Sequence, residues 1–144
     1  MIEVKATIAA TTDAVWRVLA DGWLYPLWVV GASRVRDVDE TWPDPGSRIH
    51  HSVGLWPAVL NDETTVLECA PGSRIELNAK AWPGGEADVT LHLEAQGAKT
   101  CVRMLEDVTG GPGKLVPRPV RAPVLRWRNG ESLRRLSWLA ERRG

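Results

Sequence analysis

The sequence predicts an α+β domain in which a curved antiparallel sheet of six to seven strands wraps around a long C-terminal helix. Three observations predict this fold: apolar residues that alternate with period two, turn signals at regular intervals in the middle of the chain, and an apolar stripe at helical spacing near its end. The chain has 144 residues, of which 44% are hydrophobic and 25% charged. This balance is typical of one globular domain with a sizeable core, so we expect a single domain over residues 1–144.

The N-terminal residues predict one strand followed by two short helical elements. Residues 2–8 alternate apolar and polar side chains, as a strand with one buried face does. Thr11 or Thr12 can cap a short helix whose apolar positions follow at helical spacing, and Gly22 is expected to end it. Residues 23–30 contain Pro26 among large apolar side chains, which predicts a second short helix or a tight apolar turn.

The middle of the chain is divided by turn signals into segments of strand length. Apolar and polar side chains alternate most clearly in residues 74–79 and 87–94. One face of the sheet should therefore be apolar and buried, the dry face, and the other should be exposed to solvent. The turn signals are Asp44-Pro45-Gly46, Trp56-Pro57, Pro71-Gly72, Pro83-Gly84-Gly85 and Gln96-Gly97.

A long amphipathic helix is predicted at the C-terminal end. Pro119 and Pro123 can each occupy a first helical turn, but not both in one unkinked helix, so the start is expected between them. This helix must cover the dry face, but one helix is narrower than such a sheet. We therefore expect a largely apolar pocket for a small hydrophobic ligand between the two.

Several segments resemble a known superfamily, and the resemblance spans nearly the whole chain. They are Ile8 to Trp16, Asp21 to Trp28, Pro45-Gly46, Ala70 to Arg74, Gly97 to Val102 and Asn129 to Leu136. These segments resemble the START-related superfamily, which has the helix-grip fold, and within it the bacterial polyketide cyclase/dehydrase and lipid-transport (SRPBCC) family. The resemblance implies this fold, whereas members of the superfamily range from lipid carriers to cyclases, so it does not fix the function.

The dipeptide His50-His51 carries the strongest chemical signal. Its two side chains point to opposite faces of a strand, so they cannot bind one metal together. Alternation places His51 with Ile49 on the dry face, where the imidazole could act as a general base or bind a ligand carbonyl. The alternative is a hydrogen-bonded core histidine, or a register that leaves it outside.

Two further polar residues are candidates for the pocket. Glu106 shares a face with Met104 and could reach the end of the pocket as an acid–base group; the alternative is a solvated residue at a strand end. Asn129 lies on the otherwise apolar helix stripe and could face the cavity; the alternative is a backbone partner.

The predicted lining combines these residues with strand-facing aliphatics. Most of the eight Trp should be core mass, although the resemblance implies Trp28 as a stacking residue. The predicted ligand-binding residues are Trp28, His51, Ile75, Leu77, Val89, Leu91, Met104, Asn129 and Leu133. If the protein is an enzyme, the predicted catalytic residues are His51 and Glu106.

No motif for a cofactor or a metal is present. Gly110 to Gly113 lacks the Lys-Ser or Lys-Thr pair of a phosphate-binding loop, and no zinc or dinucleotide motif occurs. Cys69 and Cys101 lie far apart in apolar segments, so we expect buried free thiols, no metal and no cofactor. With neither a leader sequence nor an apolar run of about 18 residues, we expect a cytoplasmic protein without a transmembrane span.

The C-terminal residues are strongly basic although the whole chain has no net charge. From Lys114 onward, the chain contains nine basic residues but only two acidic ones, Glu131 and Glu141. This tail could bind anionic lipid headgroups or RNA; the alternative is a solvated outer face that balances an acidic sheet. Nucleic acid is disfavoured because no RNA-recognition aromatic motif is present.

Three functions therefore remain open. The first is to bind or carry a polyketide-, aromatic- or lipid-like molecule in the predicted pocket. The second is a polyketide aromatase/cyclase-dehydratase that uses acid–base residues in the same pocket. The third is peripheral contact with a membrane or RNA through the basic helix. Both a monomer and a homodimer agree with the sequence.

Overall fold

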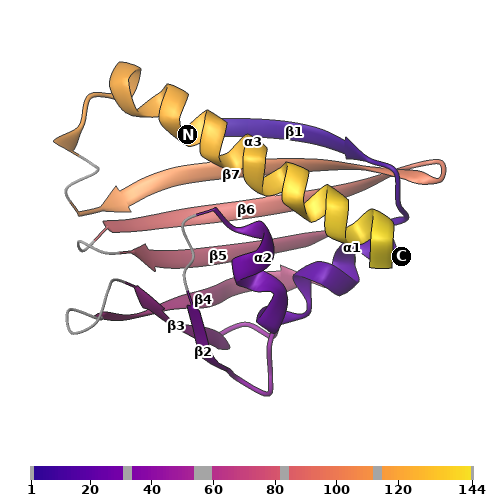
Figure 1. Ribbon diagram of the computed structural model, residues 1–144, viewed down its shortest axis with the longest axis horizontal. Helices are drawn as coiled ribbons and strands as arrows, with labels where there is room; N and C mark the ends of the chain where they lie inside the picture. The colour runs from indigo at the N-terminus through magenta and orange to yellow at the C-terminus, as the bar shows by residue number, and fades with distance from the viewer. Residues whose placement is uncertain (1, 31–33, 54–59, 82–84, 112–114, 144) are drawn as a thin grey trace.

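Seven strands form one antiparallel sheet in the order β1-β7-β6-β5-β4-β3-β2 (Figure 1). The computed structural model describes residues 2–30, 34–53, 60–81, 85–111 and 115–143. Its elements are β1 (Ile2–Ile8), α1 (Thr12–Leu19), the 3-10 helix η1 (Gly22–Leu24), α2 (Tyr25–Trp28), β2 (Arg34–Val38), β3 (Arg48–Val53), β4 (Leu60–Ala70), β5 (Arg74–Ala81), β6 (Gly85–Gln96), β7 (Lys99–Gly110) and α3 (Arg118–Arg143). The chain therefore has the predicted fold class.

The three α-helices lie on the same face of the sheet. Figure 1 shows α3 crossing the sheet along β1 and β7, with α1 and α2 beside it over the remaining strands. We call the face toward the helices the inner face. Along the opposite, outer face, charged side chains form ion pairs: Arg103 contacts Glu3 on the neighbouring strand at 3.0 Å, and Arg74 contacts Glu68 on β4 and Glu76 on its own strand.

The short elements after β1 follow local sequence signals. The side chain of Thr11 accepts a hydrogen bond from the Ala14 amide at 3.2 Å and so caps α1. The helix ends at Leu19, and Gly22 opens η1 instead of ending α1 as expected. Gly22 packs tightly there, because an added Cβ would lie 2.7 Å from the Val38 side chain.

The start of α3 differs from the prediction. The helix begins at Arg118, before both prolines, rather than between them. Pro119 lies in the first turn, where a backbone N–H has no helical partner and its absence costs nothing. Pro123 lies inside the helix and removes a single backbone hydrogen bond, which the packing of the long apolar stripe offsets.

The turn signals that fall within the described residues join the expected strands. Gly72 between β4 and β5, and Gly97 between β6 and β7, have φ of 82° and 63°, a conformation that favours glycine. The signals at Trp56-Pro57 and Pro83-Gly84 lie outside the described residues. Cys69 and Cys101 are free, and both are partly exposed rather than buried as expected. Cys69 lies opposite Ile75 on the inner face, and Cys101 lies opposite Glu94 on the outer face.

The apolar side chains between α3 and the sheet form two separate clusters. The larger cluster contains five residues with no exposed surface, Ile8, Val15, Val102, Leu136 and Ala140. Neighbours from α1, α2 and the central strands complete it. The smaller cluster contains Ile2, Ala122 and Leu125, near the start of α3.

Candidate functional site

The inner face is incompletely covered over the middle of β5 and β6. Ala79, Ala87 and Val89 point to the inner face but remain partly exposed, whereas Leu77 and Leu91 on the same strands are buried. In the strand register, Val89 pairs with Leu77, and Ala87 pairs with Ala79. We call Ala79, Ala87 and Val89 the floor. It is an apolar surface that the helices leave partly exposed, and Val89 also packs against the larger apolar cluster.

A first polar cluster borders the floor on the side of β4. Thr64, which is fully buried, lies directly opposite Ala79 across the β4–β5 ladder. Its Oγ1 lies 3.1 Å from His51 Nε2 and donates a hydrogen bond of 3.3 Å to the Tyr25 hydroxyl. The Tyr25 ring stacks on the His51 ring at 6.3 Å between centroids. We call His51, Thr64 and Tyr25 the imidazole cluster.

The hydrogen bonds of this cluster determine where the imidazole proton resides. When Thr64 donates its one hydroxyl hydrogen to Tyr25, His51 Nε2 is the donor to Thr64. The lone pair of the neutral ring is then on Nδ1. Within the described residues, His51 Nδ1 is buried without a hydrogen-bond partner. Burial lowers the pKa of His51, so the ring stays neutral near pH 7 and Nδ1 can accept a hydrogen bond or a proton.

Tyr25 connects this cluster electrostatically with a second one. Burial raises the pKa of the Tyr25 hydroxyl, and the hydrogen bond with Thr64 opposes this shift. The Glu106 carboxylate also raises this pKa and the Arg128 guanidinium lowers it, so both charges act on the hydroxyl across the interior. Tyr25 is held in place by Trp28, whose ring meets it edge-on at 5.6 Å.

The second polar cluster borders the floor on the side of β7. Glu106, which pairs with Val89 across the β6–β7 ladder, is only 3% exposed. Arg128 Nη2 donates to both of its carboxylate oxygens at 2.6 Å, and Asn129 Nδ2 donates to Oε1 at 2.8 Å. The Arg128 side chain itself is 38% exposed, so this pair reaches from the interior to solvent. We call Glu106, Arg128 and Asn129 the carboxylate cluster.

A further polar contact fixes the position of α3 relative to α2. The Val30 amide donates a hydrogen bond of 3.1 Å to Ser132 Oγ, and Ser132 is buried. This contact ties α3 to the segment that follows α2. Together with the ion pair between Arg128 and Glu106, it holds α3 at both sides of the floor.

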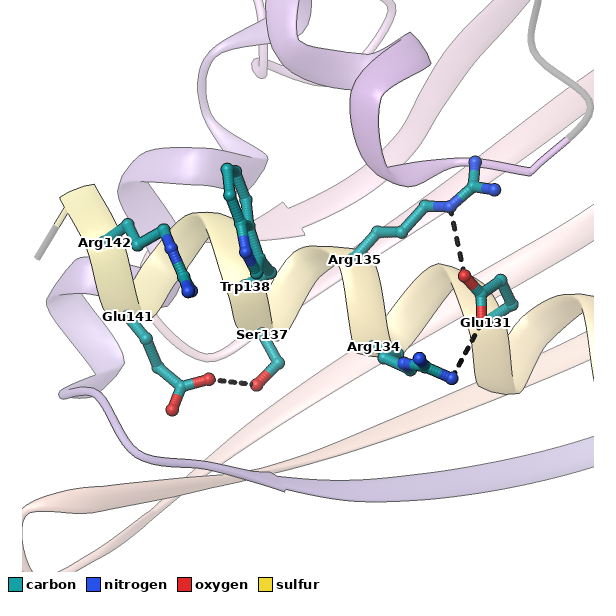
Figure 2. Close-up of a pocket in the computed structure, with 7 residues that line it drawn as sticks. All are labelled: Glu131, Arg134, Arg135, Ser137, Trp138, Glu141 and Arg142. Carbon is teal, nitrogen blue, oxygen red and sulfur yellow. Dashed lines mark hydrogen bonds and ion pairs between the residues drawn. The ribbon is translucent and has the colours of Figure 1, made fainter.

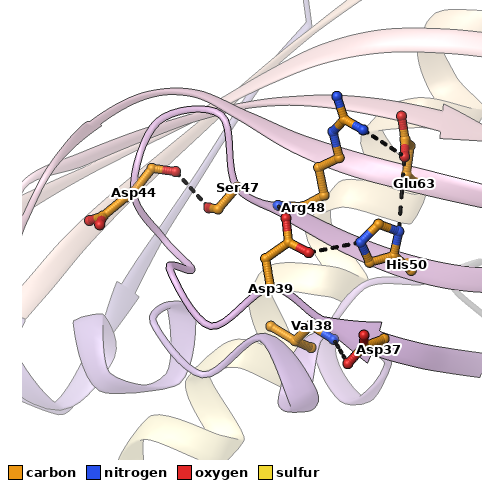
Figure 3. A network of polar contacts seen from close by, with 8 residues as sticks. All are labelled: Asp37, Val38, Asp39, Asp44, Ser47, Arg48, His50 and Glu63. Carbon is orange, nitrogen blue, oxygen red and sulfur yellow. Dashed lines mark hydrogen bonds and ion pairs between the residues drawn. The ribbon is translucent and has the colours of Figure 1, made fainter.

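His50 belongs to a different network on the outer face, as its alternation with His51 requires. Figure 3 shows His50 between Asp39 and Glu63, with Nε2 at 2.9 Å from Asp39 Oδ1 and Nδ1 at 4.0 Å from Glu63. The hydrogen bond from His50 holds the pKa of Asp39 below its ordinary value. Among the residues that the structure describes, no group of three or more His, Cys, Asp or Glu could hold a metal ion.

The residues predicted from the sequence all face the space between sheet and helices, but they occupy different places in it. His51 is in the imidazole cluster, Glu106 and Asn129 are in the carboxylate cluster, and Val89 is in the floor. The others are buried members of the larger apolar cluster: Trp28, Ile75, Leu77, Leu91, Met104 and Leu133. The sequence reasoning did not select Tyr25, Thr64 and Arg128. Thr64 shares its strand phase with the core residue Val66 and could have been found, whereas no local pattern joins Arg128 to Glu106.

A curved antiparallel sheet that holds a long C-terminal helix on one face defines the helix-grip fold of START-related proteins. The model of the polyketide cyclase / dehydrase and lipid transport family matches residues 1–141. The chain belongs to this family. By contrast, no curated protein matches it in sequence.

Solved structures with low sequence identity share the fold. A START superfamily protein from Mycobacterium smegmatis has a TM-score of 0.63 at 18% identity, covering 99% of this chain and 94% of that one. The Zhui aromatase/cyclase from Streptomyces sp. R1128 has a TM-score of 0.69 at 16% identity, covering 99% and 93%. Protein MLL2253 from Mesorhizobium loti has a TM-score of 0.72 at 18% identity, covering 99% and 98%.

Proposed function

We propose that this protein binds a small hydrophobic molecule bearing a carbonyl or hydroxyl group on the inner face of β5 and β6. The observation that carries the proposal is the floor: Ala79, Ala87 and Val89 are partly exposed, whereas Leu77 and Leu91 beside them on the same strands are buried. Such a surface suits an apolar body, because covering it removes apolar area from water. The family, whose description includes polyketide cyclases and lipid transport, supports a ligand of this class.

The two polar clusters give the ligand its orientation. A hydroxyl group of the ligand can donate a hydrogen bond to His51 Nδ1, which has no partner in the described part of the chain. On the opposite side, Arg128 engages Glu106 through Nη2 alone, so its Nη1 and Nε hydrogens are available to a carbonyl oxygen. A ligand with oxygens at both ends of an apolar body fits this arrangement.

A variant that fills the floor with a bulky side chain tests the proposal. An uncharged fluorescent probe such as N-phenyl-1-naphthylamine should bind saturably to the wild type. Ala87→Phe places a ring on the floor and should abolish saturable binding. Thr90→Phe adds the same ring to the same strand on the outer face and is the matched control. Probe binding that is absent from the wild type, or lost equally in both variants, would contradict the proposal.

The same site is suited to a second function, aromatase/cyclase chemistry on a poly-β-ketone. The observation in its favour is the neutral, buried His51 with its lone pair on Nδ1. Nδ1 would take a proton from a methylene between two carbonyls, and the resulting enolate carbon would attack a second carbonyl of the same chain. The alkoxide formed would recover the proton, and loss of water would follow. Arg128 would polarise the attacked carbonyl, with Glu106 positioning the guanidinium or acting as a second acid–base group.

Paired variants separate catalysis from binding. His51→Gln and Glu106→Gln should each abolish turnover of a poly-β-ketone substrate, while the affinity for a ligand that has carbonyl but no hydroxyl groups stays near that of the wild type. His50→Gln changes the neighbouring histidine on the outer face and should leave turnover intact. Unaltered rates in His51→Gln would exclude this imidazole as the base, and equal losses in affinity and turnover would reduce its role to binding.

A further inference from the structure

The side of α3 that faces away from the sheet exposes a stripe of apolar and cationic side chains. Val120, Val124, Trp127 and Trp138 are 54% to 68% exposed and lie at helical spacing on one side of the helix. The stripe continues with Arg134, Arg135 and Arg142 toward the C-terminal end. Leu115, just before the helix, is 86% exposed. We call these residues the α3 stripe.

The arginines of the stripe form a cationic surface with aromatic support. Figure 2 shows Arg134 and Arg135 reaching the same carboxylate, that of Glu131, at 3.6 Å and 3.4 Å. Arg142 lies over the Trp138 ring at 4.3 Å from its centroid. These side chains line a hollow of about 370 Å³ on the helix surface. Two arginines thus share one acid, and a third contacts an aromatic ring.

The outer face of the sheet shows the opposite arrangement. Three of its arginines each contact at least one carboxylate: Arg48 with Glu63, Arg74 with Glu68 and Glu76, and Arg103 with Glu3. On α3, by contrast, Arg126 has no ion pair among the described residues. The positive charge of α3 is therefore less compensated than that of these three sheet arginines, and Arg134, Arg135 and Arg142 lie on the same surface as the exposed tryptophans.

We propose that the α3 stripe is a docking surface for the headgroup region of an anionic phospholipid bilayer. Tryptophan is favoured at the boundary between water and acyl chains, and arginines beside it bind lipid phosphates. Val120, Val124 and Leu115 would bury apolar area in the bilayer, whereas they offer nothing to an RNA backbone. A second copy of the chain is disfavoured because two such faces would bring arginines against arginines.

This contact is peripheral. Within the described residues, no helix is both long and apolar enough to cross a membrane. The stripe also lies on the opposite side of α3 from the floor, so membrane docking and ligand binding can each hold without the other. Juxtamembrane arginines contribute about 1 kcal/mol each near an anionic surface, so a few of them together with two tryptophans are sufficient for reversible binding.

Flotation of the full chain with vesicles tests the docking surface. Binding should be weak with phosphatidylcholine alone, rise when phosphatidylglycerol is added, and fall with salt. The double variant R134Q/R135Q should bind anionic vesicles more than about tenfold more weakly, since two charges are lost. K80Q/K99Q removes the same charge from exposed lysines of the sheet and should bind like the wild type.

A second pair of variants tests the apolar part of the stripe. Trp127→Ser should weaken vesicle binding, whereas Leu67→Ser, at an exposed apolar residue of β4, should not. Probe binding to the floor should be unchanged in all of these variants, which keeps the two proposals separate. Four outcomes would each overturn the proposal. Two concern vesicles: the wild type binds none, or the two double variants lose binding equally. Two concern other partners: the protein retains RNA in place of vesicles, or it forms a dimer that Trp127→Ser abolishes.

Discussion

The two ends of the interior differ in how completely the helices cover the sheet. At one end, Ile8, Val102, Leu136 and Ala140 are fully buried between α1, α3 and the strands. At the other end, the floor stays accessible between the imidazole cluster and the carboxylate cluster. The first end therefore holds most of the packing that stabilises the fold, whereas the second keeps polar groups and apolar surface available to a ligand.

The largest expected effect comes from truncation at the packed end. Leu136→Ala should lower the free energy of unfolding by about 2–5 kcal/mol, because it leaves a cavity in a close-packed region. Val89→Ala, in the floor, should cost less than about 1.5 kcal/mol but weaken probe binding. Urea unfolding measures both. Equal destabilisation by the two variants would show that the floor is packed like the rest of the core.

The carboxylate cluster should respond unequally to loss of its two charged members. Arg128→Met leaves a carboxylate that is 3% exposed with only Asn129 as donor, so we expect a loss of about 3 kcal/mol. Glu106→Gln leaves the half-exposed Arg128, which water can solvate, so about 1 kcal/mol is expected. In a double-mutant cycle, Arg128→Met in the Glu106→Gln background should cost much less than in the wild type. A larger loss for Glu106→Gln than for Arg128→Met would contradict this assignment.

The difference between the two ends also explains how much of the molecule the sequence could predict. Strand alternation and the helical stripe depend on local spacing, so the fold class and the phase of His51 follow from them. The partners of His51 and Glu106 depend on pairing across the sheet and on the rotation of α3, which local spacing does not encode. Thr64 reaches His51 only through the register of β3 with β4, and Arg128 reaches Glu106 across 22 positions. The predicted start of α3 was wrong because a proline inside a helix is tolerated where packing offsets the lost backbone hydrogen bond.

The imidazole cluster should lose a smaller amount of stability when its hydroxyl link is removed. Tyr25→Phe keeps the ring against Trp28 and His51 but removes the oxygen that accepts from Thr64. We expect a loss of about 1 kcal/mol in urea unfolding. Thr64 can then donate to His51, which moves the imidazole proton to Nδ1, so a hydroxyl ligand should bind more weakly while a carbonyl ligand should not. Equal changes in affinity for both ligand types would contradict the proton assignment.

The smallest expected effect is a change in the pH dependence of stability. Because burial lowers the folded-state pKa of His51, the unfolded chain binds a proton more readily as the pH falls below the ordinary value of 6.5. The contribution of the neutral His51 to the free energy of unfolding is thus full above that pH, and it declines as the pH falls toward the folded-state pKa. His51→Gln should remove this decline, so the curves for wild type and variant should converge or cross between about pH 7 and pH 5.5. His92, whose pKa is also lowered by burial, is present in both proteins and cancels in the difference, and the lowered pKa of Asp39 acts only at more acidic pH. Parallel curves across this window would mean that the pKa of His51 is the same in the folded and the unfolded chain, which would contradict the burial of its ring.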